Sequence, residues 1–203
     1  AGLYHLPYIS ILNNEKIILG LSNLPFRFGL TSIIQYLSAL NNNFLFNDLG
    51  ILIPLASLAS FFIIYFHHEV IKFYNSEIKI NENYFFCFFV LIYIFYKINR
   101  YSEFGNDAIA HLGYFYLISY FLKLNLQNIS FKQFNYIFLI SVFIFMNKNT
   151  MIFSFFLPII LFFLAKDKIN IFKKSFFSLA SIFLIFWVLK NSLITGCIVY
   201  PLK

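Results

Sequence analysis

The sequence predicts an all-α fold, a polytopic transmembrane helical bundle of about six spans. Hydrophobic residues make up 61% of the 203-residue chain, charged residues make up 11%, and the mean hydropathy is +0.78. An average soluble domain carries about 25% charged residues, so this composition excludes an ordinary soluble globule. The longest apolar run, residues 49–66, contains no charged side chain.

A helix that crosses the bilayer core needs about 20 apolar residues, and residues 49–66 come closest to that length. The other candidate stretches are shorter, but Lys, Asn and Tyr side chains flank them and can extend their usable length by reaching the interface. These stretches are residues 84–98, 108–122, 136–146, 151–165 and 175–189. Only residues 147–150 separate the fourth span from the fifth. A tight hairpin fits this spacing better than one long broken helix, because roughly 30 continuous residues would exceed the bilayer core.

The orientation of the spans follows from the segment KDKINIFKK at residues 166–174, where four lysines outweigh Asp167. The positive-inside rule places this segment, interpreted as a loop, in the cytoplasm. Counting spans from it puts residues 67–83 inside and residues 97–107 and Lys148 outside. We therefore expect extracytoplasmic juxtamembrane helices and a loop at 1–48, a transmembrane helical region at 49–189, and the start of an extracytoplasmic loop at 190–203.

The N-terminal region contains two stretches with the apolar spacing of short amphipathic helices. The first is LPYISILNNEK and the second is FGLTSIIQYLSAL. In the second, we expect four side chains to share one face, Ile33, Ile34, Leu37 and Leu40. Helices of this kind lie on the membrane surface rather than crossing it.

Several function classes are excluded by the pattern of charges and motifs. The net charge of +7 arises from basic residues that stand singly or in short runs between apolar segments. This pattern sets membrane topology and does not indicate a nucleic-acid partner. Cys87 and Cys197 belong to no CxxC or Cys/His cluster, which argues against a disulfide framework or a zinc site. No P-loop, GxSxG or GxGxxG motif is present.

The polar residues that can carry chemistry lie on the predicted outer side. Glu103, Asp107 and His111 follow one another at four-residue intervals, so Asp107 and His111 share one helical face at the membrane boundary. A carboxylate at this depth can act as a base or bind a divalent metal. The structural alternatives are a solvated Glu103, an Asp107 that complements the helix dipole, and a packed His111 that hydrogen-bonds to a neighbour.

Two lysines, Lys148 and Lys190, are expected at the same outer boundary as Asp107, where a cation can neutralise a phosphate. The alternative is that each lysine only extends from a helix end to the interface. The sequence HHE at residues 67–69 lacks the spacing of the HExxH zinc motif, and we interpret it as a cytoplasmic interface anchor.

Two stretches resemble segments of bacterial membrane proteins of the GT-C glycosyltransferase type. In GLYHLPYISILNNEKIILGLSNLPFRFG the matching positions are residues 2–5, residues 20–24 and Arg27. In WVLKNSLITGCIVYP the matching positions are Lys190, Asn191, Gly196, Tyr200 and Pro201. This resemblance implies a multi-pass protein of the bacterial cytoplasmic membrane that transfers a sugar from a polyprenyl-phosphate donor at the outer face.

The resemblance also implies a site. The partners expected for this site are a polyprenyl-phosphate-linked sugar and membrane lipid. The resemblance assigns no resident cofactor and leaves a divalent metal open. Asp107 is the expected catalytic carboxylate, with Glu103 as its less favoured alternative, and the expected substrate-binding residues are His5, Arg27, His111, Lys148 and Lys190. GT-C enzymes carry a further catalytic carboxylate in the first outer loop. We expect it just before residue 1, so that this chain is an internal fragment that is inactive alone.

Two other functions stay open. A transporter or flippase component would handle a polar or lipid-linked solute, and a membrane scaffold would have no substrate. Transporters carry charged or helix-breaking residues near the midplane of several spans. The predicted spans have apolar centres instead, with Pro54 and Pro158 as the main interruptions. This distribution favours chemistry at one membrane surface.

Overall fold

The fold is known from a computed structural model that describes residues 5–15, 17–24, 26–43, 45–74, 81–101, 105–126, 128–197 and 200. Every regular element in these ranges is helical, which confirms the all-α class. The α-helices are α1 (His5–Asn14), α2 (Ile33–Asn41), α3 (Ile53–Tyr74), α4 (Glu82–Tyr101), α5 (Asp107–Leu122), α6 (Phe131–Asn147), α7 (Phe156–Leu164), α8 (Lys168–Phe176) and α9 (Leu179–Thr195). Short 3₁₀ helices are η1 (Leu21–Asn23), η2 (Phe26–Gly29), η3 (Asn47–Leu52) and η4 (Asn149–Phe155).

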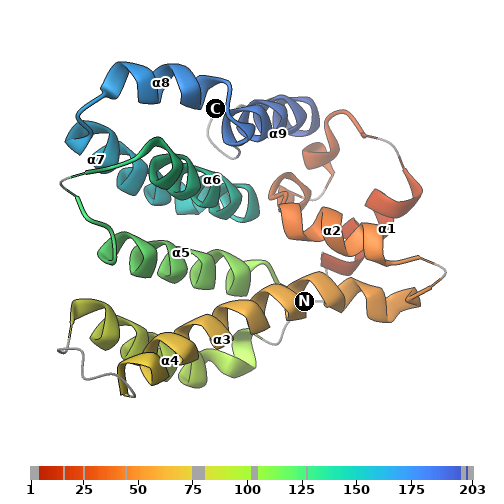
Figure 1. Cartoon of the computed structure of the whole chain (residues 1–203). Coiled ribbons are helices and arrows are strands. Elements are labelled where there is room, and N and C mark those ends of the chain that lie inside the picture. Colours follow the sequence, from red (N-terminus) through yellow and green to blue (C-terminus); the bar gives the residue numbers. More distant parts are fainter. Residues whose placement is uncertain are drawn as a thin grey trace.

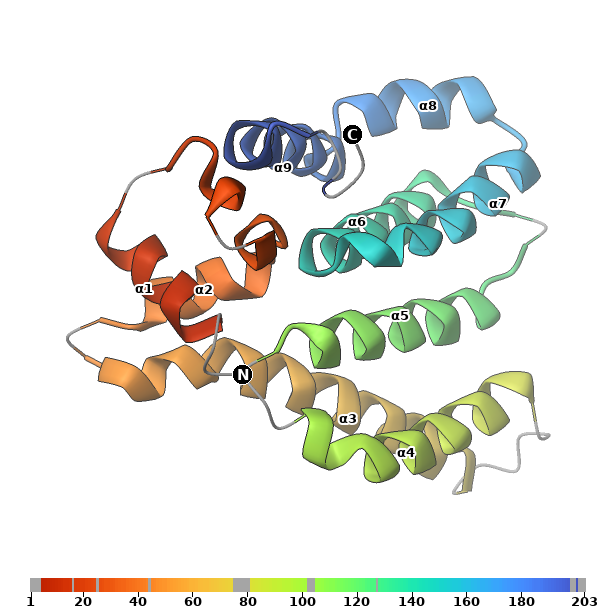
Figure 2. The same ribbon diagram turned by 180° about the vertical axis from the view of Figure 1, so that it is seen from behind.

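Helix α5 occupies the middle of the bundle, between the α3–α4 pair and α6 (Figures 1 and 2). Helix α9 packs on α6, and α8 links α7 to α9. The α1–α2 region covers one end of the bundle, where α2 contacts both α3 and α6. Gly113 of α5 allows a close approach to α6, because a Cβ atom there would lie 3.2 Å from Ile144. Helices α3 to α6 and the η4–α7 segment alternate in direction, and α9 runs in the same direction as α6 (Figures 1 and 2). The starts of α5 and η4 therefore lie at the same end of the bundle as the ends of α4, α6 and α9.

Side-chain caps fix several helix ends. Ser130 and Gln133 form a capping box at the start of α6, and Ser178 accepts a hydrogen bond from the Ser181 amide at the start of α9. Such caps satisfy backbone donors that a helix leaves unpaired. Helix α9 ends at Gly196, whose φ of 70° is the left-handed conformation that favours glycine.

The segments on either side of residues 147–150 form the hairpin that the sequence predicts, not one continuous helix. Lys148 has extended backbone angles and ends α6. The chain then reverses, and Ser141 and Ser154 each donate a hydroxyl hydrogen bond to the backbone oxygen of the other, at 3.1 and 3.2 Å. These reciprocal bonds join the two arms near the tip.

Several helix boundaries differ from the expected span boundaries. Helix α3 continues to Tyr74 and thus includes residues 67–69, while α4 continues to Tyr101. The segment interpreted as a lysine-rich loop is mostly helix α8, which Asp167 caps by accepting a hydrogen bond from the Asn170 amide at 3.3 Å. The expected sixth span begins inside α8, whereas α9 begins at Leu179 and continues past the expected boundary at 189, so Lys190 is helical. Helices α8 and α9 meet at an angle of 52°.

The four side chains expected to share one face of α2 differ in exposure. Leu40 is 72% exposed, and the buried residues of α2 are Ile34, Gln35, Ser38 and Ala39. The polar members of this face are buried because they have partners. Ser38 donates to the carbonyl of Ile51 at 2.8 Å, and Gln35 Nε2 lies 2.9 Å from Nδ1 of His5.

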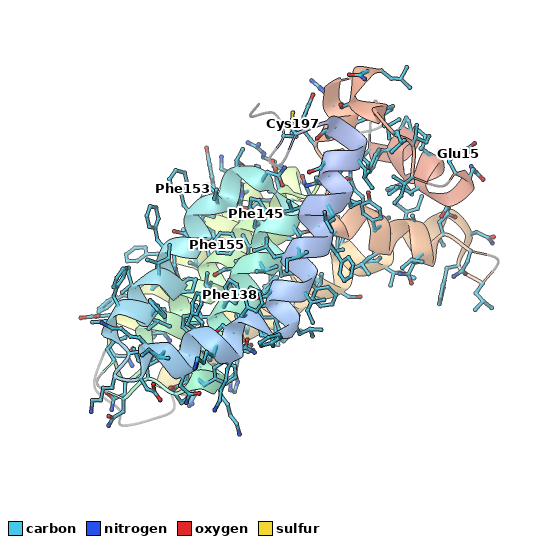
Figure 3. All side chains as sticks on the ribbon, turned by 90° about the horizontal axis from the view of Figure 1, so that it is seen from above. Glu15, Phe138, Phe145, Phe153, Phe155 and Cys197 are labelled. Atoms are coloured by element: carbon cyan, nitrogen blue, oxygen red, sulfur yellow. The ribbon has the colours of Figure 1, made fainter. Side chains whose placement is uncertain are left out.

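One helical stretch among the described residues, Asn47–Lys72, has the length and apolar composition of a membrane span, and α8 with α9 would give a second if the bent pair acted as one. Helices α5 and α6 have 16 and 17 residues. Large apolar side chains are exposed around the bundle, among them Phe95 of α4 and Phe186 of α9. Figure 3 shows the contrast on one hairpin, where Phe153 is exposed while the ring of buried Phe145 packs on Phe155.

We predict that Gly50→Ala destabilises the fold by about 3 kcal/mol, as forced overpacking does. A Cβ atom on Gly50 would lie 1.9 Å from the carbonyl oxygen of Asn41, so η3 would have to move away from the end of α2. Circular dichroism during heating measures the loss as a lower melting temperature. Gly105→Ala is the control, because the nearest atom to its new Cβ, Nε2 of His5, is 3.7 Å away. Equal melting temperatures for the two variants would contradict the close approach.

Candidate functional site

Asp107 lies between two cations at the α1–α2 end of the bundle. It is the first residue of α5, and its Oδ1 atom is 2.6 Å from Nζ of Lys148 at the end of α6. Its Oδ2 atom is 3.0 Å from Nη2 of Arg100 near the end of α4. The side chains of Asp107 and Lys148 are each 28% exposed, so this ion pair is only partly screened by solvent. We call these three residues the Asp107 cluster.

The cluster sets the protonation state of the carboxyl group. Burial alone would raise the pKa of Asp107, but the hydrogen bond and positive charge of Lys148, together with Arg100, hold the pKa below its ordinary value. Asp107 is therefore ionised at neutral pH. A phosphate that competed for Lys148 would remove part of this stabilisation and make the carboxylate more basic.

His111 lies one helical turn after Asp107, as its spacing predicts. Its Nδ1 atom is 3.2 Å from the hydroxyl of Tyr101, so it has the hydrogen-bonding neighbour that the packed alternative requires. Glu103, the less favoured acidic candidate, lies outside the described residues.

Lys190 lies among aromatic rings and neutral oxygens. Its Nζ atom is 3.3 Å from the ring centroid of Trp187 and 4.6 Å from that of Tyr36. The same atom donates to Oγ1 of Thr31 at 3.0 Å, and Thr31 donates to Oδ1 of Asn191 at 2.8 Å. Among the described residues, no carboxylate forms an ion pair with Lys190. We call these five residues the Lys190 cage.

Two buried residues connect the Lys190 cage to the Asp107 cluster. Ser32, which follows Thr31, donates to Oδ1 of Asn147 at 3.2 Å. Asn147 precedes Lys148, and its backbone oxygen accepts a hydrogen bond from Nδ2 of Asn106, the neighbour of Asp107. Polar side chains of α2, α4, α5, α6 and α9, and of residues just before α2 and α5, thus form one assembly, joined by hydrogen bonds and by adjacency along the chain. We call it the polar belt: the cluster, the cage, Ser32, Asn106 and Asn147.

Most of the unpaired buried polar atoms in the described residues are next to this belt. Buried side-chain atoms without a hydrogen-bond partner include Gln35 Oε1, Asn149 Oδ1 and Trp187 Nε1. Gln35 is three residues after Ser32 in α2, Asn149 directly follows Lys148, and Trp187 belongs to the cage. Buried polar groups normally have partners, so unpaired groups gathered in one place are expected where a polar ligand binds.

The two N-terminal candidates lie near different parts of the belt. His5 is buried in α1, and its Nε2 atom lies 3.7 Å from where a side chain at position 105 would begin, two residues before Asp107. Arg27 belongs to η2, which packs against α9, the helix of Lys190. The sequence predicts Asp107, Lys148 and Lys190 on one side of the protein, and the fold connects them through neutral polar residues of the belt.

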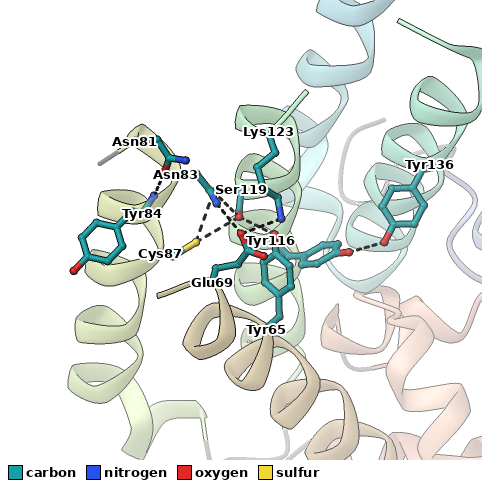
Figure 4. A network of polar contacts seen from close by, with 10 residues as sticks. All are labelled: Tyr65, Glu69, Asn81, Asn83, Tyr84, Cys87, Tyr116, Ser119, Lys123 and Tyr136. Carbon is teal, nitrogen blue, oxygen red and sulfur yellow. Dashed lines mark hydrogen bonds and ion pairs between the residues drawn. The ribbon is translucent and has the colours of Figure 1, made fainter. Parts of the chain in front are cut away.

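A second polar network lies at the opposite end of α3, α4 and α5, and sequence reasoning missed it (Figure 4). Glu69 pairs with Lys123 at 3.1 Å and accepts a hydrogen bond from Nδ2 of Asn83 at 3.0 Å. Oδ1 of Asn83 accepts from Ser119 at 2.7 Å, and the Ser119 oxygen is 2.9 Å from the Tyr65 hydroxyl. The thiol of Cys87 completes the group, 3.4 Å from Ser119. We call these six residues the Glu69 network.

The Glu69 network satisfies its own buried groups. The ammonium of Lys123 lies 4.8 Å from the Tyr65 ring centroid in addition to its ion pair with Glu69. No atom of the six residues is among the unpaired buried side-chain atoms of the described chain. This completeness indicates a structural role and distinguishes the network from the polar belt. Within the described residues, no three His, Cys, Asp or Glu side chains gather as a metal site.

Comparisons with known proteins identify a family without an assigned activity. No curated protein matches the chain, and no solved structure matches it. One family model matches residues 1–203, the whole sequence. The chain therefore belongs to the family described as "Domain of unknown function (DUF8201)".

Proposed function

We propose that this chain is part of an integral membrane glycosyltransferase of the GT-C type, with six spans. The protein would take a sugar from a polyprenyl-phosphate donor at the outer face of the bacterial cytoplasmic membrane. The observation that carries the proposal is the polar belt, which joins a paired carboxylate to two lysines at one end of an apolar bundle.

The membrane part of the proposal is supported by the exposed apolar surface. Phe95 is 81% exposed, Phe163 67% and Phe186 65%, and they belong to three different helices. Soluble monomers seldom expose large continuous apolar areas, whereas helices that face lipid do so because their side chains contact the acyl chains. Short helices such as α5 can still cross a bilayer when interfacial side chains or local thinning compensate for their length.

Cysteine labelling tests the proposed topology. We expect a membrane-impermeant maleimide to label Thr150→Cys in intact cells, in a chain where Cys87 and Cys197 are replaced by Ala. Asn170→Cys, on α8, should label only after permeabilisation, since α8 is proposed to be cytoplasmic. Both positions are exposed on the protein surface, so access depends on the membrane. Labelling of both positions in intact cells would overturn the six-span arrangement.

The belt supplies groups suited to sugar transfer. The acceptor hydroxyl oxygen would bond to the anomeric carbon while the bond from that carbon to the phosphate oxygen breaks. Asp107 would take the hydroxyl proton, and Lys148 and Lys190 would stabilise the charge that develops on the departing polyprenyl phosphate. Arrival of the phosphate at Lys148 would weaken its hold on Asp107 and so raise the basicity of the carboxylate when it is needed.

The test is donor turnover by the full-length protein in proteoliposomes. With a polyprenyl-phosphate-linked hexose and cell-envelope glycan as acceptor, we expect loss of the donor and release of polyprenyl phosphate. Transfer of intact donor between leaflets, without consumption, would support the flippase alternative and overturn the transferase proposal. Absence of both activities with hexose and pentose donors would overturn both.

A further inference from the structure

Helix α8 has an exposed apolar face although it carries three lysines. Ile169, Phe172 and Phe176 recur at helical spacing and are 71%, 63% and 59% exposed. On a neighbouring face of the helix, Ile171 and Ser175 are buried against the bundle. Lys168 and Lys173 border the apolar face. A helix with this pattern lies in the membrane interface, with its apolar side in the acyl region and its lysines at the level of the phosphates.

A groove of about 810 Å³ opens where α8 turns into α9. Lys173 and Lys174 line it, together with Asn135 of α6 and the capping residue Ser178. In the described part of the chain, neither lysine has a carboxylate in an ion pair; Lys174 lies over the Phe131 ring at 5.8 Å. The positive end of the α9 dipole adds to their charge, so the groove is electrostatically suited to an anion.

One residue of the groove wall also has an unmet polar group. Oδ1 of Asn135 is buried and has no hydrogen-bond donor. A bare phosphate cannot donate to it, but a hydroxyl on the ligand can. The ligand that fits the polar wall therefore combines an anionic phosphate with a hydroxyl group.

The remaining wall of the groove is apolar and continues along α9. Phe177 and Leu179 line the groove and are 81% and 56% exposed. Ile182, Phe183 and Phe186 follow Leu179 at helical spacing and are also exposed. This stripe offers a path for an acyl chain that starts at the lysines, which a soluble phosphate compound would not use.

We propose that the groove at the α8–α9 junction binds an anionic glycerophospholipid with a hydroxylated headgroup. Lys173 and Lys174 bind its phosphate, the headgroup hydroxyl donates to Asn135 Oδ1, and an acyl chain lies along the α9 stripe. The site is at the opposite end of the bundle from the polar belt. The inference rests on the membrane part of the proposed function and not on sugar transfer.

Binding of short-chain lipids to the full chain in neutral detergent tests the proposal, with native mass spectrometry as the readout. Dioctanoyl-phosphatidylglycerol should bind more tightly than dioctanoyl-phosphatidylcholine. Each lysine near anionic lipid contributes about fivefold, so Lys173→Gln with Lys174→Gln should weaken phosphatidylglycerol binding about twenty-fivefold. The pair Lys72→Gln and Lys132→Gln is the matched control, because it removes the same charge from exposed lysines that do not line the groove.

The Asn135 contact has its own test. Dioctanoyl-phosphatidylmethanol carries the phosphate but no hydroxyl, so the wild type should prefer phosphatidylglycerol over it severalfold. Asn135→Leu should abolish that preference while retaining the preference for anionic lipid over phosphatidylcholine. Circular dichroism melting confirms that each variant is folded. Equal binding of the two anionic lipids to wild type and variant would overturn the hydroxyl contact.

Three results would overturn the lipid site. One is tight binding of inorganic phosphate, which would show that the site does not require a lipid. Another is equal loss of binding in the control pair, which would indicate a nonspecific charge effect. The third is flotation of the chain with neutral phosphatidylcholine vesicles without any preference for phosphatidylglycerol. Failure to associate with vesicles of any composition would instead overturn the membrane part of the proposed function.

Discussion

Asp107→Asn is expected to reduce donor turnover at least about a hundredfold, the range that loss of a general base produces. The change keeps the size of the side chain but removes the charge that Lys148 and Arg100 contact at 2.6 and 3.0 Å. An amide cannot accept the acceptor's proton at neutral pH. The measurement is the release of polyprenyl phosphate by the full-length protein in proteoliposomes.

The fold should tolerate this substitution, because both cations remain partly exposed and an ion pair of this kind contributes at most about 1 kcal/mol. Glu82→Gln, on the first turn of α4, is the matched charge control and should retain wild-type turnover. Unchanged turnover in Asp107→Asn would remove Asp107 from the mechanism.

A double substitution separates catalysis from structure. Suppose that Asp107 only neutralises Lys148; then Asp107→Asn combined with Lys148→Met should turn over the donor as fast as Lys148→Met alone, since no cation remains to be neutralised. For a catalytic Asp107, the double variant should be as inactive as Asp107→Asn and clearly slower than Lys148→Met. Equal turnover of the double variant and Lys148→Met would therefore contradict the proposed role, even if Asp107→Asn is inactive.

The positions of the helices could be predicted from apolar runs, but most of their ends could not. Residues 108–122 coincide with α5 almost completely because both of its ends are marked by polar residues. By contrast, α9 begins where Ser178 caps it and continues beyond Lys190, whose ammonium group is accommodated by Trp187 and Thr31. Caps and aromatic cages depend on local three-dimensional contacts, and hydropathy does not contain them.

The buried polar side chains of α2 could not be predicted for a similar reason. Apolar spacing places Leu40 on one face with other apolar residues, yet the fold leaves Leu40 exposed and buries Gln35 and Ser38. Each has a partner from another element, His5 for Gln35 and the Ile51 carbonyl for Ser38. A partner removes most of the cost of burying a polar group, so the tertiary contact overrides the hydrophobic pattern.

Candidate site residues could be found in the sequence only where charge made them conspicuous. Asp107 and Lys148 are ionisable residues at the boundaries of predicted spans, and the predicted alternation of those spans puts them on one side. The contact between Ser32 and Asn147 joins residues 115 positions apart through neutral side chains. Nothing in local spacing marks such a pair. The signal for Asn147 is its adjacency to Lys148, whereas Asn191 is marked by the resemblance and by its adjacency to Lys190.

Lys123→Met is expected to destabilise the fold by about 2 kcal/mol, more than Glu69→Gln. Without Lys123, the Glu69 carboxylate lacks its cationic partner although its side chain is only 13% exposed. Breaking a buried ion pair from one side costs several kcal/mol, and we reduce that figure because Lys123 is 35% exposed. Glu69→Gln should cost about 1 kcal/mol, because the amide oxygen can still accept from Asn83 and the lysine can turn toward solvent.

The double variant Glu69→Gln with Lys123→Met tests whether the two charges act as a pair. It should be more stable than Lys123→Met alone, because no uncompensated carboxylate remains, and the difference from additivity measures the coupling. The measurement is the melting temperature, in detergent, of the wild-type chain, the two single variants and the double variant, which together form a double-mutant cycle. Lys72→Met is the control for loss of an exposed lysine on α3 and should change stability little. Strict additivity would mean that Glu69 and Lys123 act independently, and the network would then depend on Asn83 and Ser119 instead.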